Sequence, residues 1–556
     1  LEASLSGKGR ACFVTGQAGS GKTALVRQFM QQALASDPDL VLSVGGCNAQ
    51  TGIGDPYLPF REVLTLLTGD VTAPWEAGAM TGEQALRLWH LLPVAVQALV
   101  DAGPDLIELF VPGAPLVKRA HTYEDWPSGS DSRSQLKKLV ARKEALSSSS
   151  NLQQSALFEQ YTQVLRTLSS RKPLLLALDD LQWADGGSLN LLFHLGRRIE
   201  GSRILVIGAY RPDEVALGRP ASAALGVGAL EGEQVQHPLQ PIVHEFRRTF
   251  GAIDVDLEQA EGRRFVDAFL DSEPNRLGDA FRETLHQHTR GYALFTVELL
   301  RGMQARGDLA QDPEGRWVQG PALDWETLPA RVEAVIAQRI GRLPEGLRAA
   351  LAAASVEGEI FTAEVLAQVE QASVEETVRS LSDQLDRKHQ LVSAQGILRM
   401  GDRSLSQYRF RHILYQKHLY NGMDPVRRAA LHLEVGSALE TLYEEGAEAT
   451  VLGEASAAQL ARHFEAAGNA EKAVGYLRQA GERAQRLYAN QEAYRYFRQA
   501  LVLLDGIPSH GSGEDWRRET ATHLHENLGD IVEWNGEHDI ARESYDQALV
   551  GVPEGH

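Results

Sequence analysis

Residues 16–23 read GQAGSGKT and match the pattern G-x-x-x-x-G-K-[ST] in full. An apolar stretch at residues 11–14 precedes them, and residues 24–35 carry apolar side chains at helical spacing, so the motif joins a predicted strand to a predicted helix. Glycines let the backbone curl until successive N–H groups face one anion, and the helix adds its positive end at the same point. The stretch therefore predicts a phosphate-binding loop rather than an ordinary glycine-rich turn. The predicted nucleotide contacts are Gly16, Gln17, Ala18, Gly19, Ser20, Gly21, Lys22 and Thr23.

A second motif, ALDDLQWADG at residues 177–186, follows the apolar run at residues 173–176 and places two carboxylates where a strand is predicted to end. In a phosphate-loop fold such a strand presents an aspartate to the metal, which assigns Asp179 and the Thr23 hydroxyl to Mg²⁺. Asp180 is the candidate for orienting or deprotonating the attacking water. The alternative for Asp180 is a structural acid bonded to loop N–H groups.

Arg211 ends the next predicted strand, in the stretch ILVIGAYRPDE. An arginine at the carboxyl edge of a parallel strand can point to the position of the γ-phosphate. The alternative is a surface ion pair with Asp213 or Glu214. ATP or ADP with Mg²⁺ is the cofactor that these motifs predict.

The composition narrows the class of protein. The chain has 556 residues, too many for one hydrophobic core, and its net charge of −19 disfavours a broad nucleic-acid-binding face. Only two cysteines are present, which favours a reducing cytoplasm over a secreted disulfide scaffold. We find neither a signal-peptide pattern nor an uninterrupted apolar run that could span a bilayer. Because the chain opens with leucine, we expect it to be a fragment of a longer protein.

The order of predicted elements indicates an α/β domain followed by helical domains. Strand candidates recur at residues 40–44, 174–178 and 204–209, with helices at residues 58–110 and 189–199. This alternation predicts a parallel sheet covered by helices on both faces. Beyond residue 212 the strands nearly stop, except for a hairpin near residues 391–400 and 406–410. The predicted domains are a nucleotide domain at residues 1–217 with a polar, partly disordered insertion at about 126–151, a helical lid at 218–325, a winged-helix domain at 326–425 and helical repeats at 426–556.

The C-terminal helices show a repeat. One set of positions fits a tetratricopeptide repeat of about 34 residues, in which small side chains let two helices approach closely. These positions are Leu528, Gly529, Val532, Ala541, Tyr545, Ala548 and Pro553. Earlier units keep part of the pattern, at Ala473, Leu477 and Ala480 and at Ala493, Phe497 and Ala500. We expect the repeats to continue beyond the fragment.

Taken together, GQAGSGKT, LLLALDDLQWAD, IGAYRPDE, TRGYALFTVELL and FRHILYQ resemble the STAND class of signal-transduction ATPases. The likeness is to large bacterial regulators of the LuxR and SARP types and to ATPase regions fused to nucleotide cyclases. The resemblance implies a switch that ADP holds closed between the nucleotide domain and the winged helix. ATP exchange and signal binding on the repeats would open it and allow it to oligomerise, and slow hydrolysis would reset it. Carried over by position, the resemblance implies that Lys22 and Thr23 bind the phosphates and the metal. It also implies that Asp179 binds the metal and that Arg211 senses the γ-phosphate.

The same resemblance points to His412, in YRFRHILYQ, which follows the second hairpin strand and opens a predicted helix. It is similar to the histidine of the Met-His-Asp motif, which bonds the β-phosphate of ADP in apoptotic and plant-resistance proteins of this class. The alternative is a capping or core histidine. Arg409 and Arg411 are weaker candidates, because side chains alternate along a strand. The lid reads Gly291-Tyr292-Ala293 where family members often have Gly-Asn-Pro, so adenine contacts there are expected to differ.

Two other functions compete with the switch. An AAA+ remodelling motor would turn over ATP quickly as a stable ring, and a passive scaffold would have a vestigial nucleotide site. Lys22, Thr23 and Asp179 argue against the scaffold. We expect a signal molecule or protein on the repeats, self-association with ATP bound, no membrane, and DNA contact only through a domain outside these residues.

Overall fold

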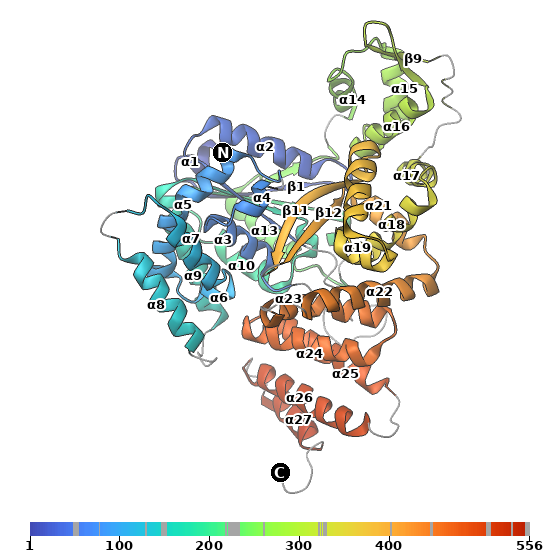
Figure 1. Cartoon of the computed structure of the whole chain (residues 1–556). Helices are drawn as coiled ribbons and strands as arrows, with labels where there is room; N and C mark the ends of the chain where they lie inside the picture. Colours follow the sequence, from blue (N-terminus) through green and yellow to red (C-terminus); the bar gives the residue numbers. More distant parts are fainter. Residues whose placement is uncertain are drawn as a thin grey trace.

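The computed structural model describes residues 1–47, 55–76, 78–127, 130–145, 153–216, 219–220, 234–259, 262–320, 323, 325, 331–400, 403–444, 449–507, 513–534 and 538–550. Figure 1 shows an N-terminal α/β domain, helices that project from it, a small module with a long hairpin, and a stack of C-terminal helices. This arrangement confirms the predicted fold class of a helix-covered parallel sheet followed by mainly helical regions.

The N-terminal domain is built on a five-stranded parallel sheet in the order β2-β3-β4-β1-β7. The strands are β1 (Arg10–Thr15), β2 (Val41–Gly46), β3 (Leu174–Asp179), β4 (Ile204–Tyr210) and β7 (Asp254–Asp256). Successive side chains of β3 enter opposite layers of the core, Leu174, Leu176 and Leu178 on one face and Leu175 and Ala177 on the other. A strand buried on both faces explains the continuous apolar run in its sequence.

Helices cover both faces of this sheet. One face carries α1 (Glu2–Leu5) and α2 (Lys22–Ser36), and the larger core on the other face includes α3, α5, α9, α10 and α13. Further helices complete the domain. The bounds of its helices after α2 are α3 Leu58–Leu67, α4 Thr72–Glu76, α5 Gly82–Ala102, α6 Leu106–Leu109, α7 Gly113–Thr122, α8 Ser132–Ala145, α9 Gln154–Arg171, α10 Gly186–Gly196, α11 Pro212–Ala216 and α13 Leu239–Phe250, with a 3₁₀ turn η2 at Leu181–Trp183.

The nucleotide domain extends beyond the predicted limit at residue 217. Strand β7 pairs with β1, and Ile242, Val243 and Phe246 of α13 are buried in the main core. Strand β7 is hard to predict from the sequence, because it has only three residues and two of them are aspartates. A short polar edge strand lacks the apolar alternation on which strand prediction depends.

The predicted polar insertion is also partly wrong. Residues 132–145 form α8, and its Leu136 and Val140 are buried in the main core. Those two side chains, four residues apart, form the apolar stripe of a helix that the serine-rich flanks obscure. Residues 128–129 and 146–151 of the predicted insertion lie outside the described residues.

By length and hydropathy alone, one helix among the described residues could cross a membrane, α5 (Gly82–Ala102). Leu88, Leu92 and Leu99 of this helix are fully buried in the main core. These three side chains are therefore accounted for by packing within the sheet domain, whereas Leu86 of the same helix is exposed.

Two helical regions follow the sheet domain. The first, referred to here as the lid, contains α14 (Gly262–Leu270), α15 (Asp279–Thr289), α16 (Ala293–Arg306) and the short hairpin β8 (Leu309–Gln311) and β9 (Trp317–Gln319). The second, the hairpin module at residues 331–421, surrounds an antiparallel sheet in the order β10-β12-β11. Its elements are α17 Val332–Gly341, α18 Glu345–Glu357, β10 Ile360–Thr362, α19 Ala363–Glu370, α20 Val374–Arg379, a π-helix at Ser380–Lys388, β11 Val392–Met400, β12 Arg403–Phe410 and α21 Ile413–Asn421. Both predicted hairpin strands are present.

The C-terminal helices pack in consecutive pairs, as the repeat pattern predicts. They are α22 Pro425–Glu444, α23 Ala449–Ala466, α24 Ala470–Arg486, α25 Asn490–Asp505, α26 Gly513–Trp534 and α27 His538–Val550. A Cβ atom on Gly529 would lie 2.4 Å from the Tyr545 ring, and one on Gly481 would lie 2.4 Å from Phe497, so glycine is required at both crossings. The predicted Pro553 lies outside the described residues.

Candidate nucleotide-binding site

The phosphate loop connects β1 to α2. Gly19 and Gly21 have φ angles of 89° and 98°, which side chains other than glycine rarely adopt. A Cβ on Gly19 would also lie 2.8 Å from the Cβ of Leu294 in the lid. Helix α2 begins at Lys22, directly after this turn, so its free N–H groups face the loop.

Lys22 lies inside the loop that it is predicted to serve. Its Nζ donates hydrogen bonds to the carbonyl oxygens of Gly16, at 2.8 Å, and Gln17, at 2.9 Å. Burial lowers the pKa of Lys22, and the positive charge of Arg211 lowers it further. An anion in the loop would relieve this effect, because it offers the ammonium group a full negative charge in place of two carbonyl dipoles.

Thr23 and Asp179 meet at the end of β3. The Thr23 hydroxyl donates a hydrogen bond of 2.8 Å to Asp179 Oδ2, and the other oxygen accepts one from the Asp180 N–H at 3.0 Å. Burial and the neighbouring Asp180 raise the pKa of Asp179. A hydroxyl and a carboxylate are hard oxygen ligands of the kind that Mg²⁺ prefers, and a cation would offset the buried charge. The two side chains therefore fit the predicted metal site.

Asp180 and Arg211 are joined in a buried network beside the loop. Asp180 Oδ1 accepts hydrogen bonds from Gln182 Nε2, at 2.7 Å, and from Arg211 Nη2, at 3.4 Å. Arg211 also pairs with Glu214 at 2.8 Å, so one of the two ion pairs considered as its alternative is formed. Its guanidinium is 8% exposed, and its Nε is buried without a hydrogen-bond partner. A buried donor of this kind remains available to a group that enters the site.

His412 belongs to the hairpin module and faces the phosphate loop. Its Nδ1 accepts the Leu414 N–H at 3.1 Å, which caps α21, and its Nε2 lies 3.2 Å from the position that a Cβ on Gly19 would occupy. Burial, followed by the positive charges of Arg211 and Lys22, lowers the pKa of His412 to about 4. The neutral ring therefore carries its proton on Nε2, since Nδ1 is the acceptor. A hydrogen-bond donor from another part of the chain is aimed at the loop.

Two further parts of the site were missed or set aside in the sequence. The Leu294 N–H of the lid donates to the Gly19 carbonyl at 3.0 Å. Gly291, which begins the departure from the family pattern, has a φ of 70°, and a Cβ there would lie 2.2 Å from Gly262. The backbone conformation and the close approach to Gly262 therefore require glycine at position 291.

Arg409, a weaker candidate than His412 by strand alternation, also lies near the site. Although burial acts to lower the pKa of Arg409, its ion pair with Glu359, at 2.6 Å, and the charges of Asp179 and Asp180 raise it. Arg409 thus lies close enough to the site for its charge to act there. Strand alternation was misleading because β12 ends at Phe410, so His412 no longer follows the strand's two-residue period. Arg411, in contrast, pairs with Asp386 at 2.6 Å.

Comparisons with known proteins give a family match that covers the phosphate loop and the end of β3. Residues 1–207 match the AAA ATPase domain family. A structural match, covering 99% of this chain and 75% of the other, is the crystal structure of a Signal Transduction ATPase with Numerous Domains (STAND) protein with a tetratricopeptide repeat sensor from Pyrococcus horikoshii. The two chains are 13% identical, and the TM-score is 0.34. The comparison with curated proteins gives no match. The chain thus has a region similar to the AAA ATPase domain family, at residues 1–207, and C-terminal helices that pack in consecutive pairs.

Proposed function

We propose that this protein is a STAND-type nucleotide switch, held closed by ADP and opened by ATP, and that it hydrolyses ATP slowly to return to the closed state. The observation that carries the proposal is the position of His412, a neutral donor on the hairpin module, against Gly19 of the phosphate loop. A diphosphate in the loop would bond to both parts of the chain and hold them together. Nucleotide identity would then set the position of the module.

The contacts of Arg211 support a different effect of ADP and ATP on the position of the hairpin module. Arg211 is held by Asp180 and Glu214, and Glu214 lies 3.6 Å from Lys417 of the hairpin module. A γ-phosphate would compete with both carboxylates for the Arg211 guanidinium. Loss of the Arg211–Glu214 pair would change the charge that Glu214 presents to Lys417, so the γ-phosphate would act on a contact between the nucleotide domain and the module.

Hydrolysis is assigned to the carboxylates at the end of β3. Mg²⁺, held by Thr23 and Asp179, would neutralise charge on the β- and γ-phosphates. Asp180 accepts the proton of the attacking water, and Gln182 and Arg211 hold its carboxylate in place. Because Arg211 is engaged in two ion pairs, we expect turnover to be slow until the module moves.

Asp180→Asn should reduce the ATPase rate by at least about 100-fold, since a positioned base contributes on the order of 10²–10⁴ to a rate. Nucleotide affinity should change by less than about threefold, since the amide oxygen still accepts from Arg211. Single-turnover kinetics and equilibrium binding measure the two effects. Asp39→Asn is the control, because Asp39 is an exposed carboxylate at the opposite end of the sheet. A wild-type ATPase rate in Asp180→Asn would contradict the catalytic role and support a structural role for Asp180.

The switch and the motor differ in shape and rate. For the switch we expect a compact monomer with ADP and an expanded or self-associated protein with a non-hydrolysable ATP analogue, measured by light scattering and small-angle scattering. A stable ring with fast turnover in both states would support the AAA+ motor instead. Absence of nucleotide binding would support the scaffold. As a switch the protein would act in the cytoplasm, with its signal molecule or protein partner on the repeats and its output in a domain outside these residues.

A further inference from the structure

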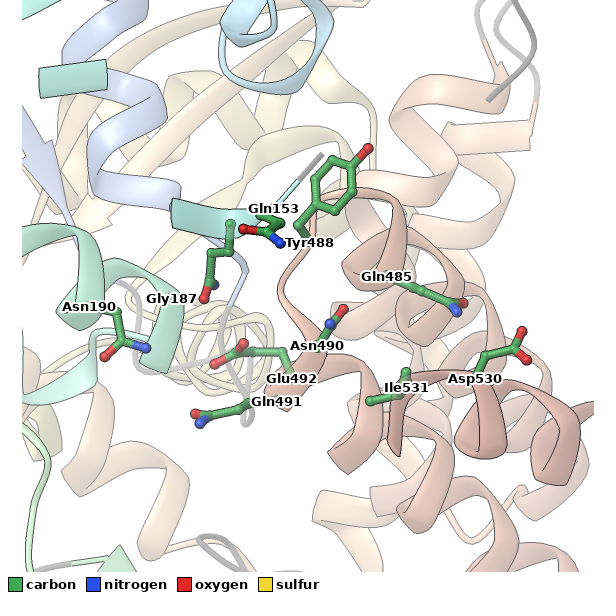
Figure 2. A pocket seen from close by; sticks show the side chains of 11 residues that line it. Gln153, Gly187, Asn190, Gln485, Tyr488, Asn490, Gln491, Glu492, Asp530 and Ile531 are labelled. Atoms are coloured by element: carbon green, nitrogen blue, oxygen red, sulfur yellow. The ribbon is translucent and has the colours of Figure 1, made fainter. Parts of the chain in front are cut away.

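The repeats are attached to the nucleotide domain at the start of α10. Glu492, in the first turn of α25, accepts the Gly186 N–H at 2.8 Å and is 1% exposed. Gly186 is the first residue of α10, and a Cβ there would lie 2.9 Å from the Glu492 carboxylate. Figure 2 shows Glu492 extending from its helix toward Gly187. The glycine pair therefore forms a seat for one side chain of the repeats.

The same helix start already has its own carboxylate cap. Asp185 is 3% exposed, accepts the Ser188 N–H at 2.8 Å and bonds the Ser188 hydroxyl. Two acids from distant parts of the chain thus share one helix end. The positive end of a helix is equivalent to roughly half an elementary charge, so it cannot balance two buried negative charges.

Within the described part of the chain, the surroundings of this acid pair favour its protonated form. Burial, and then Glu492, raise the pKa of Asp185 to about 7. Burial also raises the pKa of Glu492, although the positive charge of Arg495 opposes the shift. Further titratable neighbours are the phenols Tyr57 and Tyr496 and the thiol of Cys47, whose pKa values burial raises as well, and Asp530, which borders the same cavity as Glu492.

A second contact between the repeats and the nucleotide domain contains both a carboxylate and its cations. Arg483 of α24 pairs with Asp55 at 2.8 Å, and Asp55 also pairs with Arg61 at 2.9 Å. This cluster has a cation for its carboxylate, in contrast to the acid pair. It therefore contributes to docking without a requirement for an added proton.

We propose that seating the repeats on α10 takes up one proton, shared by Asp185 and Glu492, so that acid strengthens the docked state and rising pH loosens it. The effect on turnover rests on the proposed function. Only the 3₁₀ turn η2 separates Asp180 from the acid pair, and Gln182 in that turn bonds Asp180. Release of the repeats would free the helix that follows the catalytic carboxylates.

The direction of the pH dependence follows from the protonation of the two carboxylates in the docked and undocked states. Undocked, both carboxylates are in water with pKa values of about 4, and docked they retain a proton up to a pH of about 7. Between these limits the docked state binds more protons, so docking should strengthen by up to about tenfold for each unit that the pH falls. Above a pH of about 7 the dependence should level off.

A cavity borders Glu492, one member of the pair. Its volume is about 620 Å³, and it is bordered by both parts of the chain (Figure 2). Its lining includes Glu492, Asp530 and several carboxamides, among them Asn190, Gln485 and Gln491. Protons can therefore exchange with Glu492 while the repeats remain docked.

The test uses the full chain without nucleotide. Arg197→Cys, directly after α10, and Val502→Cys on α25 replace exposed residues and carry a pair of dyes, with Cys12 and Cys47 replaced by alanine. The distance between the dyes reports docking, and the urea concentration that separates them reports its strength. For the wild type this concentration should fall as the pH rises from 5 to about 7.

The variants separate the proton effect from other titrations. Glu492→Gln keeps an oxygen for the Gly186 N–H and needs no proton, so docking at pH 8 should become stronger and its pH dependence should largely disappear. Arg483→Gln should weaken docking at every pH and retain the wild-type slope. Equal slopes in the wild type and Glu492→Gln would overturn the proposal. The pH dependence of docking could be lost in Glu492→Gln while ADP and ATP have the same effect on the protein's shape. In that case the proposed proton uptake is supported and the proposed nucleotide switch is contradicted.

Discussion

Lys22→Ala should weaken binding of both ADP and ATP by about 10- to 150-fold, because a hydrogen bond to a charged group contributes about 1.5–3 kcal/mol. Lys22 is the ammonium group inside a loop of backbone amides, and its Nζ is held at 2.8 Å and 2.9 Å from two loop carbonyls. Without the side chain, the phosphates would retain only the N–H groups and the end of α2. Isothermal titration with each nucleotide, in the presence of Mg²⁺, measures the loss.

The control is Lys8→Ala, which removes an exposed lysine of the same domain. It changes the net charge by the same amount and should leave both affinities unaltered. Circular dichroism should show that Lys22→Ala is folded. Wild-type affinity in the folded variant would contradict the assignment of the loop.

The central part of the site could be predicted from the sequence because its motifs are local. The phosphate loop requires glycines and a lysine within eight consecutive residues, and Asp179 directly ends an apolar strand. Chain connectivity alone places such residues near one another once the parallel sheet is formed. The structure brings Thr23 within 2.8 Å of Asp179, as the pattern required.

The features that were missed depend on tertiary packing. Strand β7 has two aspartates among its three residues, so its pairing with β1 leaves no mark in the hydropathy pattern. The charge of Arg409 acts on the aspartates only because the hairpin module is seated on the nucleotide domain. Gly186 and Glu492 are 306 positions apart, and no local pattern connects a glycine at a helix start with a glutamate in a distant repeat.

The largest differential effect is expected at His412, where two roles can be separated. His412→Asn keeps a side-chain oxygen that can accept the Leu414 N–H, so the cap of α21 is preserved. The shorter side chain removes the imidazole Nε2 that faces Gly19. ADP affinity should fall by about tenfold or more, since the lost bond is to a charged phosphate. ATP affinity should change much less, because the open state does not use this contact.

His418→Asn is the matched control, since it alters a histidine in the last turn of the same helix. It should leave both affinities as in the wild type. His412→Ala, which removes the cap as well, should reproduce the ADP defect with some added loss of stability.

The ratio of the ADP and ATP dissociation constants, measured by titration for the wild type and His412→Asn, tests the switch most directly. We predict that the wild type prefers ADP, that His412→Asn loses most of this preference, and that ADP no longer keeps the variant compact. An unchanged ratio in a folded His412→Asn protein would contradict it.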